Sequence, residues 1–293
     1  MGFFNFAKKL LPFCVGAFLL SAPVQLHAFR AERRVKQMGV HKIDHAEGLK
    51  RIEHFRNQRL NGDYSLKFEL QHKPRKGKQI SYSGILWGTW NTQGPLVRVA
   101  LWAENPEAAP LNFIIQGGPN PKFWKSINGG SFVALKKEEI FEPLLPGLIY
   151  TPFDLLTPYA YWDEMDYEGV KRIKGRPAHL FLMSPPEALM QTNPELGPVR
   201  MALDADFNAI IQADWLTPQG DKARAFKILN IKKTQGEWIL KTVDLVDEKS
   251  HDKTRFNVTA AALGLSLNPK HYFTPKKARA QAPAIDWNAY ERL

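Results

Sequence analysis

Two clusters of polar side chains in this sequence could support chemistry, and the first is HKIDH. His41 and His45 stand four residues apart around Asp44, a spacing that can place two imidazoles on one helix face beside a metal ion. Asp44 is better explained as a helix cap, because Glu47 follows it by three residues, as in a capping box. His41 would then precede the helix, so we expect no metal and no cofactor here.

The second cluster is WDEMDYE, which contains Asp163, Glu164, Asp166 and Glu168. Two of these carboxylates could act as a general acid and base, or several could bind calcium. On an exposed loop they could equally be solvated, or pair with the basic residues between 171 and 176. A hydrolase that uses Asp163 or Glu164 would need a polar cleft in which these carboxylates converge.

The remaining catalytic motifs are missing from the sequence. It has no Gly-x-Ser-x-Gly elbow and no phosphate-binding loop, and its only cysteine is Cys14. We therefore expect a protein that is not an enzyme.

The N-terminus predicts export. Lys8 and Lys9 precede the apolar run LLPFCVGAFLL, which ends in SAPVQLHA, so residues 1–28 read as a signal peptide cleaved after Ala28. A retained membrane anchor is the alternative, but the apolar run is short for a membrane span. Phe13 stands where a lipobox requires a small residue before the cysteine. The mature chain then has no cysteine and must be held together by its core.

The charge of the chain is basic, with a formal value of +11 that falls to +9 without Lys8 and Lys9. Such an excess could serve nucleic acid, an anionic lipid surface or an acidic partner. Export disfavours nucleic acid, and the densest basic cluster, HKPRKGK at 72–78, lies between two predicted strands, as a solvated hairpin loop would.

The elements expected after the signal peptide are one helix and many strands. The helix follows Asp44 and ends before Asn61 and Gly62. YSLKFELQ at 64–71 then alternates apolar and polar residues, which predicts a strand with one buried face. Further strand-like runs follow at short spacing, with Gly, Pro and Asn between them, and they resume after residue 177. This pattern favours an antiparallel meander.

Between Pro119 and Glu168 the regular pattern stops, and the chain becomes aromatic and rich in proline. Its most apolar part is YTPFDLLTPYAYW, which runs from Tyr150 to Trp162 and is too short and too broken by proline to span a membrane. It could be ordinary core, or a removable lid that screens a cavity until an apolar ligand enters. Burying a dozen methylenes contributes roughly 10 kcal/mol, so acyl chains would suit such a cavity.

The order of parts resembles the outer membrane lipoprotein-sorting proteins, the LolA/LolB-like periplasmic carriers. The local likeness lies in PFDLL, in YWDEMDYEGVKRIKGRPAHLFLM and in DKTRFNVTAAALGL. The resemblance implies a mainly β (α+β) fold, an unclosed antiparallel β-barrel of about eleven strands with a short helical lid. It places the lipid-binding domain at 29–274 and leaves 275–293 as a basic, loosely ordered tail.

The resemblance also implies a function and a location. The protein would work in the periplasm and carry acyl chains of lipoproteins, or another lipid, toward the outer membrane. Its partners would include an inner-membrane release complex and an outer-membrane acceptor, but no nucleic acid. The alternative is an envelope scaffold that binds a protein partner through its aromatic middle and exposes an aromatic patch.

The residues predicted to form the cavity and lid come from the strands and from the aromatic middle. On the strand at 79–91 we favour Tyr82, Leu86 and Trp90 as the inward set over Ile85 and Trp87, because Gly84 and Gly88 share that face and leave room. The full prediction is Tyr82, Leu86, Trp90, Trp102, Phe113, Phe123, Trp124, Leu144, Leu145, Phe153, Leu155, Leu156, Tyr159, Tyr161 and Trp162.

Overall fold

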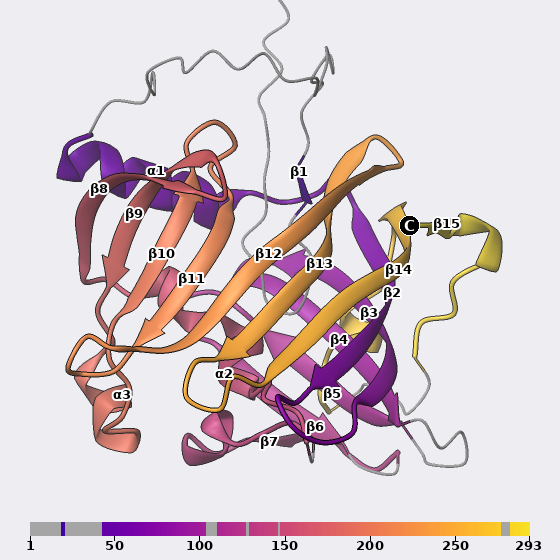
Figure 1. Cartoon of the computed structure of the whole chain (residues 1–293). Helices are drawn as coiled ribbons and strands as arrows, with labels where there is room; N and C mark the ends of the chain where they lie inside the picture. Colours follow the sequence, from indigo (N-terminus) through magenta and orange to yellow (C-terminus); the bar gives the residue numbers. More distant parts are fainter. Residues whose placement is uncertain (1–18, 21–42, 104–109, 127–128, 146, 277–281) are drawn as a thin grey trace, which may run out of the picture.

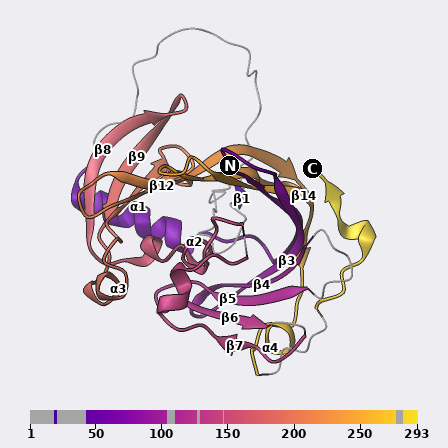
Figure 2. The ribbon, with the colours of Figure 1, turned by 60° about the horizontal axis from the view of Figure 1, so that its bottom comes forward.

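The computed structural model describes residues 19–20, 43–103, 110–126, 129–145, 147–276 and 282–293. They form one curved antiparallel sheet of fifteen strands in the order β7-β6-β5-β4-β3-β2-β14-β13-β12-β11-β10-β9-β8, with β1 and β15 off this path. The described end strands β7 and β8 do not pair with each other, so the barrel is unclosed (Figures 1 and 2). The predicted fold class is confirmed, with more strands than expected.

The strands of the sheet are β1 (Leu19–Leu20), β2 (Asp63–Lys73), β3 (Ile80–Asn91), β4 (Gly94–Ala103), β5 (Leu111–Gln116), β6 (Lys122–Ser126), β7 (Val133–Ala134), β8 (Met165–Ile173), β9 (Arg176–Met183), β10 (Val199–Asp204), β11 (Ile210–Leu216), β12 (Lys222–Thr234), β13 (Glu237–Asp247), β14 (Lys253–Leu265) and β15 (Glu291–Arg292). The helical elements are α1 (His45–Asn57), η1 (Glu138–Phe141), α2 (Pro152–Leu156), η2 (Pro158–Tyr161), α3 (Glu187–Thr192), α4 (Pro269–Tyr272) and η3 (Trp287–Ala289).

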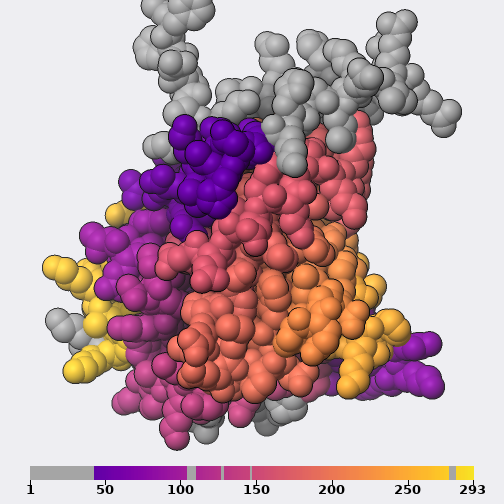
Figure 3. All heavy atoms as spheres, turned by 90° about the vertical axis from the view of Figure 1, so that its left-hand side faces the viewer, coloured from indigo at the N-terminus to yellow at the C-terminus, as the bar shows by residue number. Residues whose placement is uncertain are grey.

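Helix α1 begins where the sequence predicts. The Asp44 carboxylate accepts a hydrogen bond of 2.7 Å from the Glu47 backbone N–H, so Asp44 is a cap. Ile52 and Phe55 are buried on one face of α1, and Figure 3 shows the helix against the β8–β9 side of the sheet. His41 lies outside the described residues, as does the predicted signal peptide apart from Leu19–Leu20, which pair with β13.

The inner face of β2 and β3 is built by aromatic rings lying over glycines. Phe68 lies directly opposite Gly84, and Tyr64 directly opposite Gly88. A Cβ atom on Gly84 would come within 2.3 Å of the Phe68 ring, and one on Gly88 within 2.0 Å of the Tyr64 ring. The inward face of β3 is therefore the face with Gly84 and Gly88, as predicted, but the rings of Phe68 and Tyr64 fill the space beside these glycines.

The outer face of β3–β6 carries a second apolar cluster, which the C-terminal residues cover. Trp87, Leu96 and Ile114 are buried there against Phe273, which follows α4. Leu267 and Ile285 also pack on this cluster.

The C-terminal residues beyond 282, expected to be loosely ordered, make defined contacts with the sheet. The Leu293 N–H donates to the Thr259 carbonyl at 3.0 Å, and the Tyr290 hydroxyl lies 2.7 Å from Ser65 Oγ. The Lys67 ammonium lies over the rings of Trp287 and Tyr290. The prediction of a loose tail depended on its basic, proline- and alanine-rich composition, which does not show that Tyr290 and Leu293 have partners on the sheet.

The segment between β7 and β8 crosses the concave side from one open edge of the sheet to the other. It contains η1, α2 and η2, with α2 lying inside the curve in Figure 2. None of the helices in the described ranges is long and apolar enough to cross a membrane.

Candidate functional site

The lid over the concave face is the described part of residues 144–162, and the fold of its second half follows from local sequence. Thr151 caps α2 by accepting from the Asp154 N–H, while the Asp154 carboxylate accepts from the Thr151 N–H at 2.7 Å. Pro152 occupies the first turn, where its missing N–H is not needed. Thr157 then takes a left-handed conformation with φ of 44° and ends α2 before Pro158 begins η2. The predicted broken segment is thus two short helical turns.

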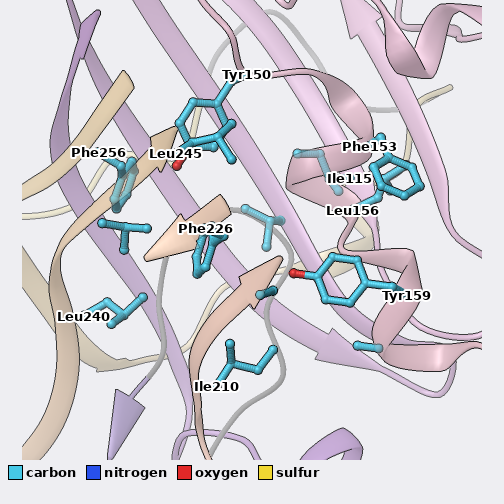
Figure 4. Close-up of a cluster of buried hydrophobic side chains, with 14 of the residues drawn as sticks. Ile115, Tyr150, Phe153, Leu156, Tyr159, Ile210, Phe226, Leu240, Leu245 and Phe256 are labelled. Atoms are coloured by element: carbon cyan, nitrogen blue, oxygen red, sulfur yellow. The ribbon is translucent and has the colours of Figure 1, made fainter. Parts of the chain in front are cut away.

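Beneath the lid lies an apolar void of about 30 Å³. Its walls are aromatic and aliphatic side chains from both the sheet and the lid, and Figure 4 shows Tyr150 of the lid facing Phe226 and Phe256 of the sheet. The lining residues are Phe68, Leu70, Val99, Leu101, Phe113, Leu144, Tyr150, Asp154, Leu155, Phe226, Val243 and Phe256. This volume holds about one water molecule, so the lid is closed in this conformation.

A larger groove adjoins the void at the open edge of the barrel. It has a volume of about 490 Å³ and lies between β6, β7, η1 and the start of α2. Phe113 and Leu144 line both the void and the groove, so these two side chains separate them. Val133 at the rim is 66% exposed. Displacement of Leu144 with the lid would join the two spaces.

A buried ion pair fixes the lid to the sheet. Arg224 Nη1 of β12 lies 3.0 Å from Asp154 Oδ2, and Arg224 Nη2 also donates to the Ile149 carbonyl. Asp154 Oδ1 is buried without a hydrogen-bond partner among the described residues. Burial raises the pKa of Asp154, while Arg224 and the hydrogen bonds from Thr151 lower it. The lid is therefore held by a carboxylate whose charge depends on Arg224.

A second arginine holds the far end of the lid. Arg56 of α1 donates from Nε to the Ala160 carbonyl at 2.7 Å and from Nη2 to the Trp162 carbonyl at 2.8 Å. Its guanidinium also lies 5.7 Å from the centre of the Tyr161 ring. Burial lowers the pKa of Arg56. Both arginines therefore hold backbone carbonyls of the lid, Arg56 from α1 and Arg224 from β12.

The structure brings most of the predicted site residues to the concave side. Nine are buried in the main core: Tyr82, Leu86, Phe113, Phe123, Leu144, Phe153, Leu156, Tyr159 and Trp162. Four are partly buried against it: Trp90, Leu145, Leu155 and Tyr161. Phe113, Leu144 and Leu155 are the members of the prediction that line the void itself.

Two predicted residues, Trp102 and Trp124, lie on the opposite face and need correction. Both pack on the outer cluster with Trp87. Trp102 follows Leu101 on β4, and because successive side chains alternate between faces, Leu101 lines the void while Trp102 points outward. Aromatic character alone does not identify the inner face, because this sheet is apolar on both faces of β3–β6.

The sequence-based prediction of the site missed several residues that line the void, although the alternation of apolar and polar residues along a strand could have identified them. Phe68 and Leu70 belong to the inward set of the strand at 64–71, and they line the void. The Arg224–Asp154 pair had no such signal, because its partners are far apart in the sequence and only the fold brings them together.

The alternative chemical sites do not assemble in the described structure. Asp163 and Glu164 are exposed, and Glu168 forms an ion pair with Arg200. No group of three or more His, Cys, Asp or Glu in the described ranges could hold a metal ion. Phe153, Tyr159 and Trp162 of the lid are buried, whereas the scaffold interpretation predicts that such aromatic residues lie in an exposed patch.

Comparison with known proteins relates the chain to solved structures by fold. No protein-family model and no curated protein matches it. A domain assigned to the outer membrane lipoprotein-sorting proteins from Vibrio parahaemolyticus is similar at 11% identity and a TM-score of 0.63, covering 77% of this chain and 94% of that chain. A DUF1329 family protein from Desulfovibrio piger is similar at 11% identity and a TM-score of 0.59, covering 79% and 95%.

A LolA superfamily protein from Nitrosomonas europaea is similar at 11% identity and a TM-score of 0.58, covering 80% of this chain and 99% of that chain. At this identity the likeness concerns the fold. The chain therefore has the unclosed antiparallel barrel of the LolA type over most of its length, as the sequence resemblance implies.

Proposed function

We propose that this protein is a periplasmic carrier that encloses the acyl chains of a lipoprotein, or of another lipid, beneath the lid of its half-barrel. The observation that carries the proposal is the apolar void beneath the lid, flanked by a groove that shares Phe113 and Leu144 with it. The fold likeness to the LolA superfamily structure supports the same function. The cargo would move toward the outer membrane.

The closed void is far too small for an acyl chain, so binding requires the lid to move. Opening the lid separates the Arg224–Asp154 pair and uncovers buried lid side chains, at about 1.5–3 kcal/mol for each large apolar one. Transfer of a dozen methylenes from water contributes roughly 10 kcal/mol, which offsets the exposure of several such side chains. We therefore expect long acyl chains to displace the lid and ligands with only a few methylenes to leave it closed.

The proposal is tested by titrating the protein with a fluorescent fatty acid and displacing it with unlabelled palmitate. Val243→Phe adds side-chain volume to the void wall and is expected to weaken uptake at least tenfold. Ser83→Phe, an exposed position on β3, is the matched control and is expected to bind like the wild type. Absence of saturable uptake by the wild-type protein would overturn the proposal, as would equal binding by both variants.

A further inference from the structure

One end of the sheet, away from the void, contains a strand edge without a partner strand. The pairing of β11 with β12 ends at Gln212 opposite Lys227, although β12 continues to Thr234. Within the described chain, residues 228–233 therefore pair with no residue on the β11 side, although Ile210 and Ile211 of β11 line a groove with them. Figure 1 shows β12 and β13 running away from β11 toward their common turn.

An apolar groove of about 220 Å³ lies along this free edge. Its aliphatic lining comes from β8, β11, β12 and β13, and includes Ile173, Ile210, Ile211, Ile228, Leu229 and Leu240. Leu229 is 43% exposed at the groove. The volume is below the roughly 300 Å³ of a drug-sized pocket, so it suits one or two apolar side chains.

Basic side chains border the same edge. Lys174 Nζ, from the β8–β9 turn, donates to the Ile228 carbonyl at 2.7 Å and so occupies a position that a neighbouring strand would fill. Lysine at a free edge is a common protection against unwanted strand pairing. Lys232 and Lys233 follow on β12, are exposed and form no ion pair within the described residues.

We propose that residues 228–233 of β12 bind an extended acidic segment of a partner protein as an added strand. The free backbone groups supply the ladder, and the groove receives alternate apolar side chains of the segment. Neighbouring residues of a strand point to opposite faces, so the carboxylates of the segment that point away from the groove pair with Lys232, while Lys174 and Lys233 keep the edge positively charged. A membrane surface would not use the strand ladder, and a second copy of this edge would present like charges, so an acidic peptide fits the site better.

The test uses the full chain and a synthetic peptide of alternating glutamate and valine, followed by hydrogen exchange. Backbone amides of residues 228–233 are expected to exchange at least tenfold more slowly when the peptide is bound. The double variant Lys232→Glu, Lys233→Glu should weaken peptide binding at least tenfold. Lys249→Glu, in the exposed β13–β14 turn, is the control and should bind like the wild type.

Several outcomes would overturn this proposal without touching the proposed carrier function, which is read by fatty-acid uptake. One is peptide binding that leaves the amides of 228–233 unprotected or protects the 237–241 edge of β13 instead. A second is protection of 228–233 by anionic vesicles of phosphatidylglycerol but not by the peptide. A third is protection that appears when the protein alone is concentrated, which indicates self-association.

Discussion

Removal of the Arg224 side chain should release the lid. In Arg224→Met the Asp154 carboxylate remains buried without its cation, and the Ile149 carbonyl loses its donor. Two charges 3.0 Å apart interact with about 5 kcal/mol at an effective dielectric of about 20. Desolvation of the pair offsets part of this, and breaking a buried pair typically costs about 3–5 kcal/mol. We expect the free energy of unfolding to fall by about 3 kcal/mol at pH 7.

The pH dependence of this variant distinguishes an unpaired charge from lost packing. Burial raises the pKa of Asp154, and Arg224 is the largest opposing influence, so the variant should raise that pKa further. The folded variant then binds a proton more readily than the unfolded chain. Its stability should fall as pH rises from about 4 through the raised pKa, and the loss relative to wild type should shrink in acid.

Urea unfolding between pH 4 and pH 8 and limited proteolysis within residues 144–162 measure this effect. The matched double variant Arg224→Met, Asp154→Asn removes the unpaired charge and should recover much of the stability at pH 7. A loss for Arg224→Met that is the same at every pH, or no recovery in the double variant, would refute the proposed latch.

Three further predictions concern the sheet. Gly84→Ala places a Cβ within 2.3 Å of the Phe68 ring and should lower the free energy of unfolding, measured in urea, by about 1–3 kcal/mol. Phe68→Leu in the same chain should restore part of this loss. Full stability of Gly84→Ala alone would contradict the close packing of Phe68 on Gly84. Burial lowers the pKa of His179, so the free energy of unfolding should fall as pH drops below about 6.5. His179→Gln should make the free energy of unfolding less dependent on pH in this range. An unchanged dependence on pH would show that other groups cause it. Deletion of 267–293 removes Phe273 from the outer cluster and should increase dye binding and aggregation, whereas a chain shortened only by 286–293 should increase neither; equal aggregation of both would contradict the role of Phe273.

The parts of the fold that the sequence predicts are those with a clear local signal. Asp44 and Glu47 identify the start of α1, and alternation at 64–71 identifies the inner face of β2. Pro152 and Pro158 indicate a broken segment, which is the observed lid. In each case the residues that determine the structure lie within a few positions of one another.

The parts that the sequence could not supply depend on distant contacts. Trp102 points outward by the alternation of side chains along β4, but its apolar character did not reveal this, because the C-terminal residues cover the outer face and both faces of β4 are apolar. The strand β8 begins in a segment whose acids suggested an exposed loop, but Glu168 is balanced by Arg200 on β10. The pairing of Asp154 with Arg224 likewise exists because the lid crosses the concave face.

The most direct test of the carrier proposal is mass spectrometry of lipids extracted from the mature protein after gentle purification from its own envelope. The proposal predicts long acyl chains at close to one lipid molecule per protein, and a marked loss of that lipid in Val243→Phe but not in Ser83→Phe. Wild-type protein that carries no lipid and takes up none when supplied would contradict it.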